Sequence, residues 1–181
     1  SLLPLLHQNM DEALKMAEVA VNEYASEFNS TWISGMRLKL GLFGEEEDDF
    51  KLTQSLFEWM ESSKVDYTET FRDLTYENLF EKEIYKSLSF RNWHSLWQAR
   101  LSRNSKPIKT ALNMMRKYNP IIVPYNQLVE EALLAAEEGD MQPFLKLLSV
   151  LEKPFEFSSS NEVFLNSMVE PNPHYQTFCG T

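Results

Sequence analysis

The feature that most constrains the fold is the stretch of residues 119–154, in which two amphipathic helical patterns meet at Gly139 and Asp140 between flanking prolines. The first pattern places apolar side chains on one helix face: Leu128, Ala132, Ala135 and Ala136, with Val129 and Leu133 beside them. The second pattern has the same i, i+3, i+4, i+7 spacing, at Phe144, Leu147, Leu148 and Leu151. Two helices joined this closely must lie antiparallel, so the sequence predicts an αα-hairpin that buries both faces.

The ends of both helices are also encoded in this stretch. Asn126 is a candidate N-cap for the first helix, and Gly139 can adopt the left-handed conformation that ends it. Asp140 then caps the second helix, and Pro143 falls in its first turn, where no hydrogen-bonded N–H is lost. Pro154 stops the second helix.

The same periodicity predicts further helices earlier in the chain. We expect them over residues 11–28, 31–40, 48–62, 66–74, 90–104 and 108–118, with a short helix and loops over 75–89. Asp11 is the candidate cap of the first, and a new helix starts at Asn29 or Ser30. The candidate buried side chains of the first helix are Leu14, Ala17, Val21 and Tyr24. Those of the later helices are Leu52, Leu56, Trp59 and Met60, then Ile108, Leu112 and Met115. In the helix over 90–104, one side is formed by Phe90, Trp93, Leu96, Trp97, Arg100 and Leu101.

Taken together, these patterns predict an all-α fold, an irregular multi-helix bundle with a C-terminal αα-hairpin and an extended tail. A chain of 181 residues with 43% apolar residues can form one domain with a substantial core. We therefore expect a helical domain over residues 1–154 and an irregular tail over 155–181.

The charge balance excludes one class of partner. The chain has 17 basic and 27 acidic residues, a net charge of −10, whereas a protein that binds nucleic acid needs an excess of positive charge. A basic strip at residues 100–109 is the local exception. The sequence contains no apolar run of about 20 residues, so no membrane partner is expected. One cysteine and no signal peptide predict a cytoplasmic protein, and a start at Ser1 without Met predicts a fragment.

Two local features have both a chemical and a structural interpretation. The acidic run from Gly44 to Asp49 is a candidate metal site, but it lacks the ligand spacing of a calcium loop, which favours a solvated loop. His94 is a candidate general base, but no Ser, Cys or Asp is placed to partner it, which favours a packing or surface role. Glycine-rich phosphate loops, kinase signatures and zinc motifs are absent from the sequence. We therefore assign no catalytic, cofactor-binding or metal-binding residue to this chain.

The pattern N-P-x-x-x-P-x-N-x-x-V-E-E-A-L-x-A-A-x-x-G-D-x-x-P-F-x-x-L-L-x-x-L over residues 119–151 resembles the C-terminal part of the selenoprotein O family, also called SelO or YdiU. The ending Y-Q-T-F-C-G-T at residues 175–181 is similar to the tail of its bacterial members, and residues 32–42 and 66–74 also resemble the family. One departure is Tyr125, where many members have an arginine, which puts a phosphate- or carboxylate-binding role there in doubt.

The resemblance implies a function for a larger parent protein. Family members have a kinase-like fold and, as pseudokinases, transfer AMP from ATP to protein hydroxyls with a divalent metal. The residues that bind ATP and magnesium belong to a kinase-like core that precedes the matching segment. The resemblance therefore implies that this chain is a helical region that packs on that core and is inactive alone. The protein substrates of the parent would be modified by the core. An autonomous helical interaction module is the alternative, and a thiol redox protein is disfavoured because there is only one cysteine.

Cys179 is the one position to which the resemblance assigns chemistry. Family members have cysteine or selenocysteine three places from the end, and this position is linked to redox control. The resemblance thus makes Cys179 a possible redox-regulatory residue that pairs with a cysteine of the core, while a free thiol on a frayed tail is the other interpretation. Mass spectrometry of the parent under non-reducing conditions distinguishes the two.

Overall fold

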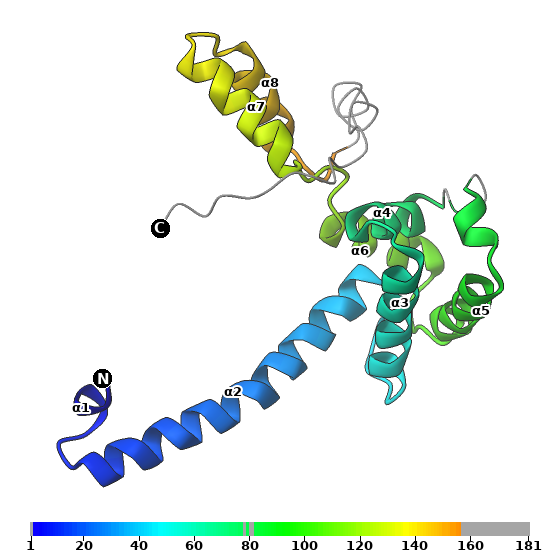
Figure 1. Ribbon diagram of the computed structural model, residues 1–181. Helices are drawn as coiled ribbons and strands as arrows, with labels where there is room; N and C mark the ends of the chain where they lie inside the picture. The colour runs from blue at the N-terminus through cyan, green and yellow to red at the C-terminus, as the bar shows by residue number, and fades with distance from the viewer. Residues whose placement is uncertain (1, 78, 80–81, 157–181) are drawn as a thin grey trace.

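The computed structural model describes residues 2–77, 79 and 82–156, and all regular structure in these residues is helical, which confirms the all-α prediction. The α-helices are α1 (Leu3–Leu6), α2 (Met10–Lys39), α3 (Asp49–Ser63), α4 (Tyr67–Tyr76), α5 (Leu88–Ser102), α6 (Ile108–Tyr118), α7 (Asn126–Glu137) and α8 (Gln142–Leu151), and a 3-10 turn, η2, spans Glu83–Lys86. Figure 1 shows three parts: a group formed by α3 to α6, a long α2 that runs away from it, and the hairpin of α7 and α8. None of the described helices combines the length and hydropathy that a membrane crossing requires.

The long helix α2 corrects two predictions. The predicted division at Asn29 or Ser30 is absent, because neither residue breaks a helix and the helix continues through both with only a small loss of propensity. The cap is Asn9 rather than Asp11, since its side-chain oxygen accepts hydrogen bonds from the N–H groups of Asp11 (2.9 Å) and Glu12 (3.3 Å).

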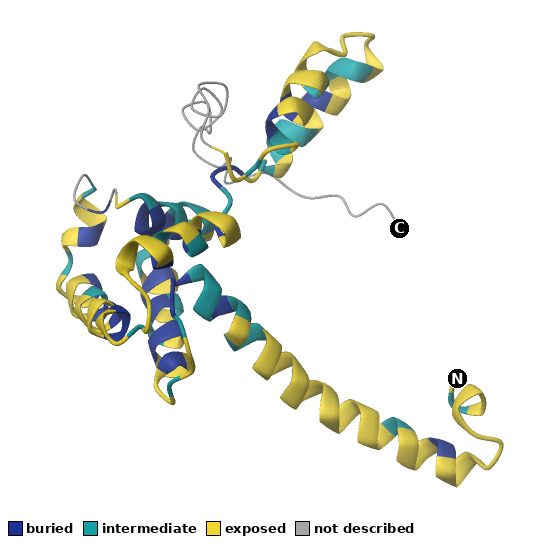
Figure 2. Ribbon diagram, turned by 180° about the vertical axis from the view of Figure 1, so that it is seen from behind, coloured by how far each residue is buried: buried dark blue, intermediate teal, exposed yellow. Residues whose placement is uncertain are grey.

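The predicted buried face of this segment is also largely exposed. Leu14, Val21 and Tyr24 are exposed to solvent. Figure 2 shows that most residues of α2 are exposed along the part that precedes its contact with α3. The prediction that this face is buried is therefore wrong at these three residues, because the short α1 is the described helix that lies against this part of α2.

The main core lies where the carboxyl end of α2 meets α3, α4, α5 and α6. Its buried side chains include Met36, Leu40, Leu52, Leu56, Trp59, Met60, Phe71, Leu74, Phe90, Trp93, Trp97, Leu101 and Met115. Two tryptophans of α5 bury their rings and still satisfy their N–H groups, because Trp93 donates to the carbonyl of Leu52 and Trp97 to that of Leu40, both at 2.9 Å. Ile108, which the sequence predicts to be buried, is exposed, and so is Leu96 on the aromatic side of α5.

The turn after α2 requires glycine. Gly41 has φ +72°, and a Cβ atom there would lie 3.0 Å from the sulfur of Met115 and 3.2 Å from Cβ of Ala111. Helix α6 can therefore approach α2 closely only because this position has no side chain.

The hairpin of α7 and α8 forms a second, smaller core. Its buried residues are Ile122, Ala132, Leu147 and Val150. The N–H of Ile121 donates to the carbonyl of Pro154 at 2.7 Å, which joins the two ends of the hairpin. The proposed domain boundary at residue 154 stays a prediction, because nearly all of the tail lies outside the described residues.

The predicted turns of the hairpin are partly correct. Gly139 has φ +94° and Pro143 lies in the first turn of α8, as predicted. Asp140 is not the N-cap of α8, which is Met141, one position later; Asp140 accepts a hydrogen bond from the N–H of Gln142 at 3.0 Å. Asn126 is the first helical residue, and the N-cap is Tyr125, one position earlier than predicted. Leu133, which was predicted at the edge of the buried face, is exposed.

We predict a large difference between two leucine substitutions in the hairpin. Leu147 is 6% exposed and Leu133 is 48% exposed. Leu147→Ala should lower the free energy of unfolding of the hairpin by roughly 2–5 kcal/mol, because it leaves a cavity, whereas Leu133→Ala should change it by less than about 1 kcal/mol. Hydrogen exchange of the α7 and α8 amides measures both values, and equal effects would contradict the assignment of the buried face.

Candidate functional site

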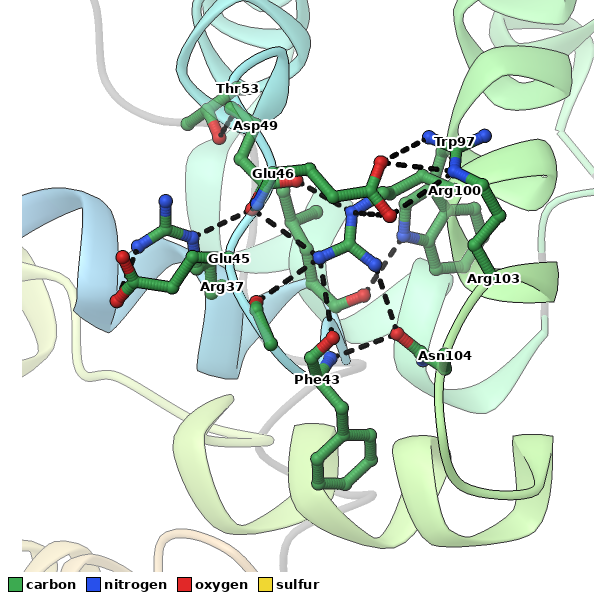
Figure 3. Close-up of polar contacts among 12 residues, drawn as sticks. Arg37, Phe43, Glu45, Glu46, Asp49, Thr53, Trp97, Arg100, Arg103 and Asn104 are labelled. Atoms are coloured by element: carbon green, nitrogen blue, oxygen red, sulfur yellow. Dashed lines mark hydrogen bonds and ion pairs between the residues drawn. The ribbon is translucent and has the colours of Figure 1, made fainter.

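The most strongly built polar site in the described residues is centred on Asp49, at the start of α3. Its side chain is 0% exposed. Arg37 of α2 donates from Nε to one carboxylate oxygen of Asp49, and Arg100 of α5 donates from Nε to the other, both at 2.7 Å (Figure 3). One carboxylate thus connects α2 and α3, which are consecutive, with α5, which lies about 50 residues further along the chain.

A second layer of hydrogen bonds surrounds Arg100. Its Nη2 donates to the carbonyls of Phe43 (3.3 Å) and Gly44 (3.1 Å), and its Nη1 donates to the side-chain oxygen of Asn104 at 3.2 Å. The same Asn104 oxygen accepts from the N–H of Phe43 at 2.9 Å, and its amide nitrogen donates to the carbonyl of Gly41 at 2.9 Å. The loop between α2 and α3 is therefore fixed to α5.

Glu46 connects this loop to the surface. Its N–H donates to Asp49 at 3.0 Å, and its carboxylate is paired with Arg103 at 2.6 Å. We call Arg37, Glu46, Asp49, Arg100, Arg103 and Asn104 the Asp49 network (Figure 3).

The electrostatics of the network hold Asp49 in its charged form. Burial alone would raise the pKa of this carboxyl, but hydrogen bonds from Arg100, from the N–H of Glu46 and from Arg37 lower it below its usual range. The pKa of Glu46 is also lowered, chiefly by its hydrogen bond from Arg103. Carboxylates with lowered pKa values are poor general bases near neutral pH, so the geometry supports a structural role.

The solvated-loop interpretation holds for Gly44, Glu45, Glu47 and Asp48, which are exposed, and is wrong for Asp49. Asp49 is buried and Glu46 is half-buried, because the fold brings arginines to them. No cluster of three or more His, Cys, Asp or Glu side chains suited to a metal ion occurs in the part of the chain that the structure describes. The basic strip at residues 100–109 begins with Arg100 and Arg103, both of which are engaged by acidic partners.

The sequence carries one signal for this network, the position of Arg100. Arg100 falls on the apolar face of its helix, among Phe90, Trp93 and Trp97. A charged side chain at a buried position needs a partner of opposite charge, so this placement alone implied a buried carboxylate elsewhere in the chain.

A second buried carboxylate, Asp73 of α4, holds the segment around η2. Lys82 contacts it, and the hydroxyl of Tyr85 donates to it at 2.8 Å. Burial and then the adjacent Asp73 raise the pKa of Tyr85, so the phenol stays protonated. These contacts tie residues 82–86 to α4, in a region where the sequence predicted only a short helix with loops.

His94 of α5 lies between aromatic rings, as the packing interpretation requires. Its ring centroid is 5.8 Å from that of Phe90 and 5.4 Å from that of Trp97. Burial lowers its pKa. His94 also lines a cavity of about 460 Å³ together with Leu74, Trp97 and Leu101. Cys179 lies outside the described residues, so its redox role stays a prediction.

Comparisons with known proteins identify the family of this chain. The family model "Protein adenylyltransferase SelO" matches residues 2–152. Similar proteins include the protein nucleotidyltransferases YdiU of Clostridium botulinum (strain Eklund 17B / Type B) at 41% identity, Halalkalibacterium halodurans at 42% and Nitrosococcus oceani at 41%. In each case the match covers 100% of this chain and 37% of the relative, so the chain spans little more than a third of the length of these relatives.

The relatives are named as protein nucleotidyltransferases, and this is the class to which the matches point. The chain belongs to the SelO family. The resemblance seen in the sequence is thereby confirmed over most of the chain.

We predict that the Asp49 network depends far more on Arg100 than on Arg103. Arg100→Met should lower the free energy of unfolding by roughly 3–5 kcal/mol, because it leaves a buried carboxylate with one of its two guanidinium partners missing. Arg103→Met removes an exposed ion pair, so it should lower the free energy of unfolding much less than Arg100→Met does. Urea unfolding monitored by tryptophan fluorescence compares the two, and equal losses would refute the central position of Arg100.

His94 should contribute a pH-dependent part of the stability. Because its pKa is lowered in the folded chain, the unfolded chain binds more protons just below the ordinary value of about 6.5. The free energy of unfolding should therefore decrease as the pH falls through this interval. His94→Phe should reduce the difference in melting temperature between about pH 7.5 and about pH 5.5, and an unchanged difference would contradict the assignment.

Proposed function

We propose that this chain is the C-terminal helical region of a protein adenylyltransferase and braces a kinase-like core that carries out the chemistry. The parent would transfer AMP from ATP to Ser, Thr or Tyr hydroxyls of protein substrates, with magnesium bound in that core. The observation that carries the proposal is the match of residues 2–152 to the SelO family together with a span of 37% of the relatives' length.

The geometry of the described residues supports a bracing role. The carboxylates of Asp49 and Asp73 are paired with basic side chains inside the protein, and the arginines that could hold phosphate, Arg37 and Arg100, are committed to Asp49. Charges used in this way stabilise one arrangement of helices. The rigid group of α3 to α6, with the exposed apolar part of α2 beside it, suits a region that supports a kinase-like core.

The alternative, an autonomous interaction module, also uses the exposed apolar positions of α2 and of the hairpin. It differs in one respect, because an autonomous module would bind its partner without any dependence on a kinase-like core. Removing residues 2–156 from the parent separates the two proposals.

We expect three results with labelled ATP, magnesium and a protein acceptor. The parent should transfer AMP, the chain alone should not, and the parent without residues 2–156 should lose both thermal stability and transfer. Transfer by the chain alone would refute its non-catalytic role. A truncated parent as stable and active as the whole would refute the bracing role and favour the autonomous module.

A further inference from the structure

The first two-thirds of α2 carries a regular apolar stripe that no described helix of the main core covers. Its members alternate at spacings of four and three residues, as in the a and d positions of a coiled coil: Met10, Leu14, Ala17, Val21, Tyr24 and Phe28. We call these six residues the α2 seam. All of its large side chains are exposed, and Val21 reaches 70%. Such a continuous exposed stripe marks an interaction surface.

The packed core begins one turn beyond the α2 seam. Trp32, four residues after Phe28 and at the e position beside the seam, lies against Phe50 and Phe57 of α3, with ring centroids 5.8 Å apart in both pairs. Phe50 stands at the amino end of α3 and is itself exposed. One face of α2 is therefore covered by α3 at its carboxyl end and open beyond it (Figure 1). An occupant of the seam would extend the layer that α3 begins.

The charges beside the seam restrict what this occupant can be. Residues 10–28 contain five acidic side chains and one basic side chain, Lys15, which is paired with Glu12 at 3.1 Å. Glu18 and Glu27 fall at the e and g positions, one on each side of the seam. Positions of this kind select a partner helix by charge, so lysine or arginine is favoured on the facing helix. A second copy of α2 would bring two acidic helices together and is disfavoured.

We propose that the α2 seam binds an amphipathic helix with lysine or arginine beside its apolar positions, contributed by the remaining polypeptide of the parent adenylyltransferase. This inference rests on the proposed function and adds the chemistry of the contact. The helix lies along α2 with one end near Phe50, and its basic side chains face Glu18 and Glu27.

Two valines on opposite faces of α2 provide a matched test in the full-length parent. Val21 is on the seam, while Val19, which is 53% exposed, falls at the f position on the far face. Val21→Asp should accelerate amide hydrogen exchange of residues 10–28 by more than about tenfold, and Val19→Asp should leave it unchanged. The exchange of α3 to α6 serves as the folding control, because it should be the same in both variants.

A second test examines the charge of the partner. Carbodiimide coupling joins carboxylates to lysines in direct contact, and it should link Glu18 or Glu27 to a lysine of the remaining polypeptide. Glu27→Lys should weaken the protection of residues 10–28, and Glu23→Lys, on the far face, should not.

The inference is overturned if residues 10–28 exchange rapidly in the unaltered parent, if Val19→Asp and Val21→Asp act alike, or if the cross-links join two copies of α2. A failure of the proposed function would give a different result. If the proposed function is wrong, the parent without residues 2–156 keeps its stability and its AMP transfer, whether or not the seam is covered.

Discussion

The carboxylate of Asp49 is withdrawn from water, and the arrangement of the surrounding helices follows from how that charge is compensated. Two guanidinium groups at 2.7 Å, from α2 and α5, offset the cost of its desolvation. Because a carboxylate without them would be strongly destabilising, the three helices can meet in few other ways. Asn104 and the carbonyls of the α2–α3 loop complete the hydrogen bonds of Arg100, so the buried charges leave little freedom in this region.

Around this network the protein uses ordinary apolar packing, in two separate places. The larger core contains Trp93 and Trp97, whose N–H groups donate to the backbone carbonyls of Leu52 and Leu40, so these two rings are buried with their polar atoms satisfied. The smaller core belongs to the hairpin, which is connected to the rest through residues 119–125. Asn119 secures this connection, since its amide donates to the carbonyl of Lys39 at 2.8 Å and to the hydroxyl of Thr75 at 2.9 Å.

The proposed bracing role would give these features a common explanation. A region that supports a catalytic core needs a fixed internal geometry and a surface shaped for that core. The Asp49 network would supply the first requirement, and the α2 seam would supply the second. Both depend on side chains with no catalytic chemistry, which is consistent with a sequence in which no phosphate-binding motif was found.

The sequence by itself determined where most helices lie and how several of them end, because these properties depend on neighbours within four residues. The spacing of Leu52, Leu56 and Trp59, the proline before Ile108 and the glycine at 139 act locally, and the structure agrees with each. The continuation of α2 through Asn29 was missed because propensity there is too weak to fix a boundary.

Only the tertiary structure decided which apolar faces are covered and which charges meet. Leu133 and Leu147 look alike in sequence, yet one is exposed and the other is buried, because coverage depends on what lies opposite. Arg100 and Asp49 are 51 residues apart, and no periodic pattern connects them. Local spacing shows that a helix face is apolar or that a charged residue lies on an apolar face. The residues that cover the face or pair with the charge are distant in the sequence, and the packing of the whole chain decides which they are.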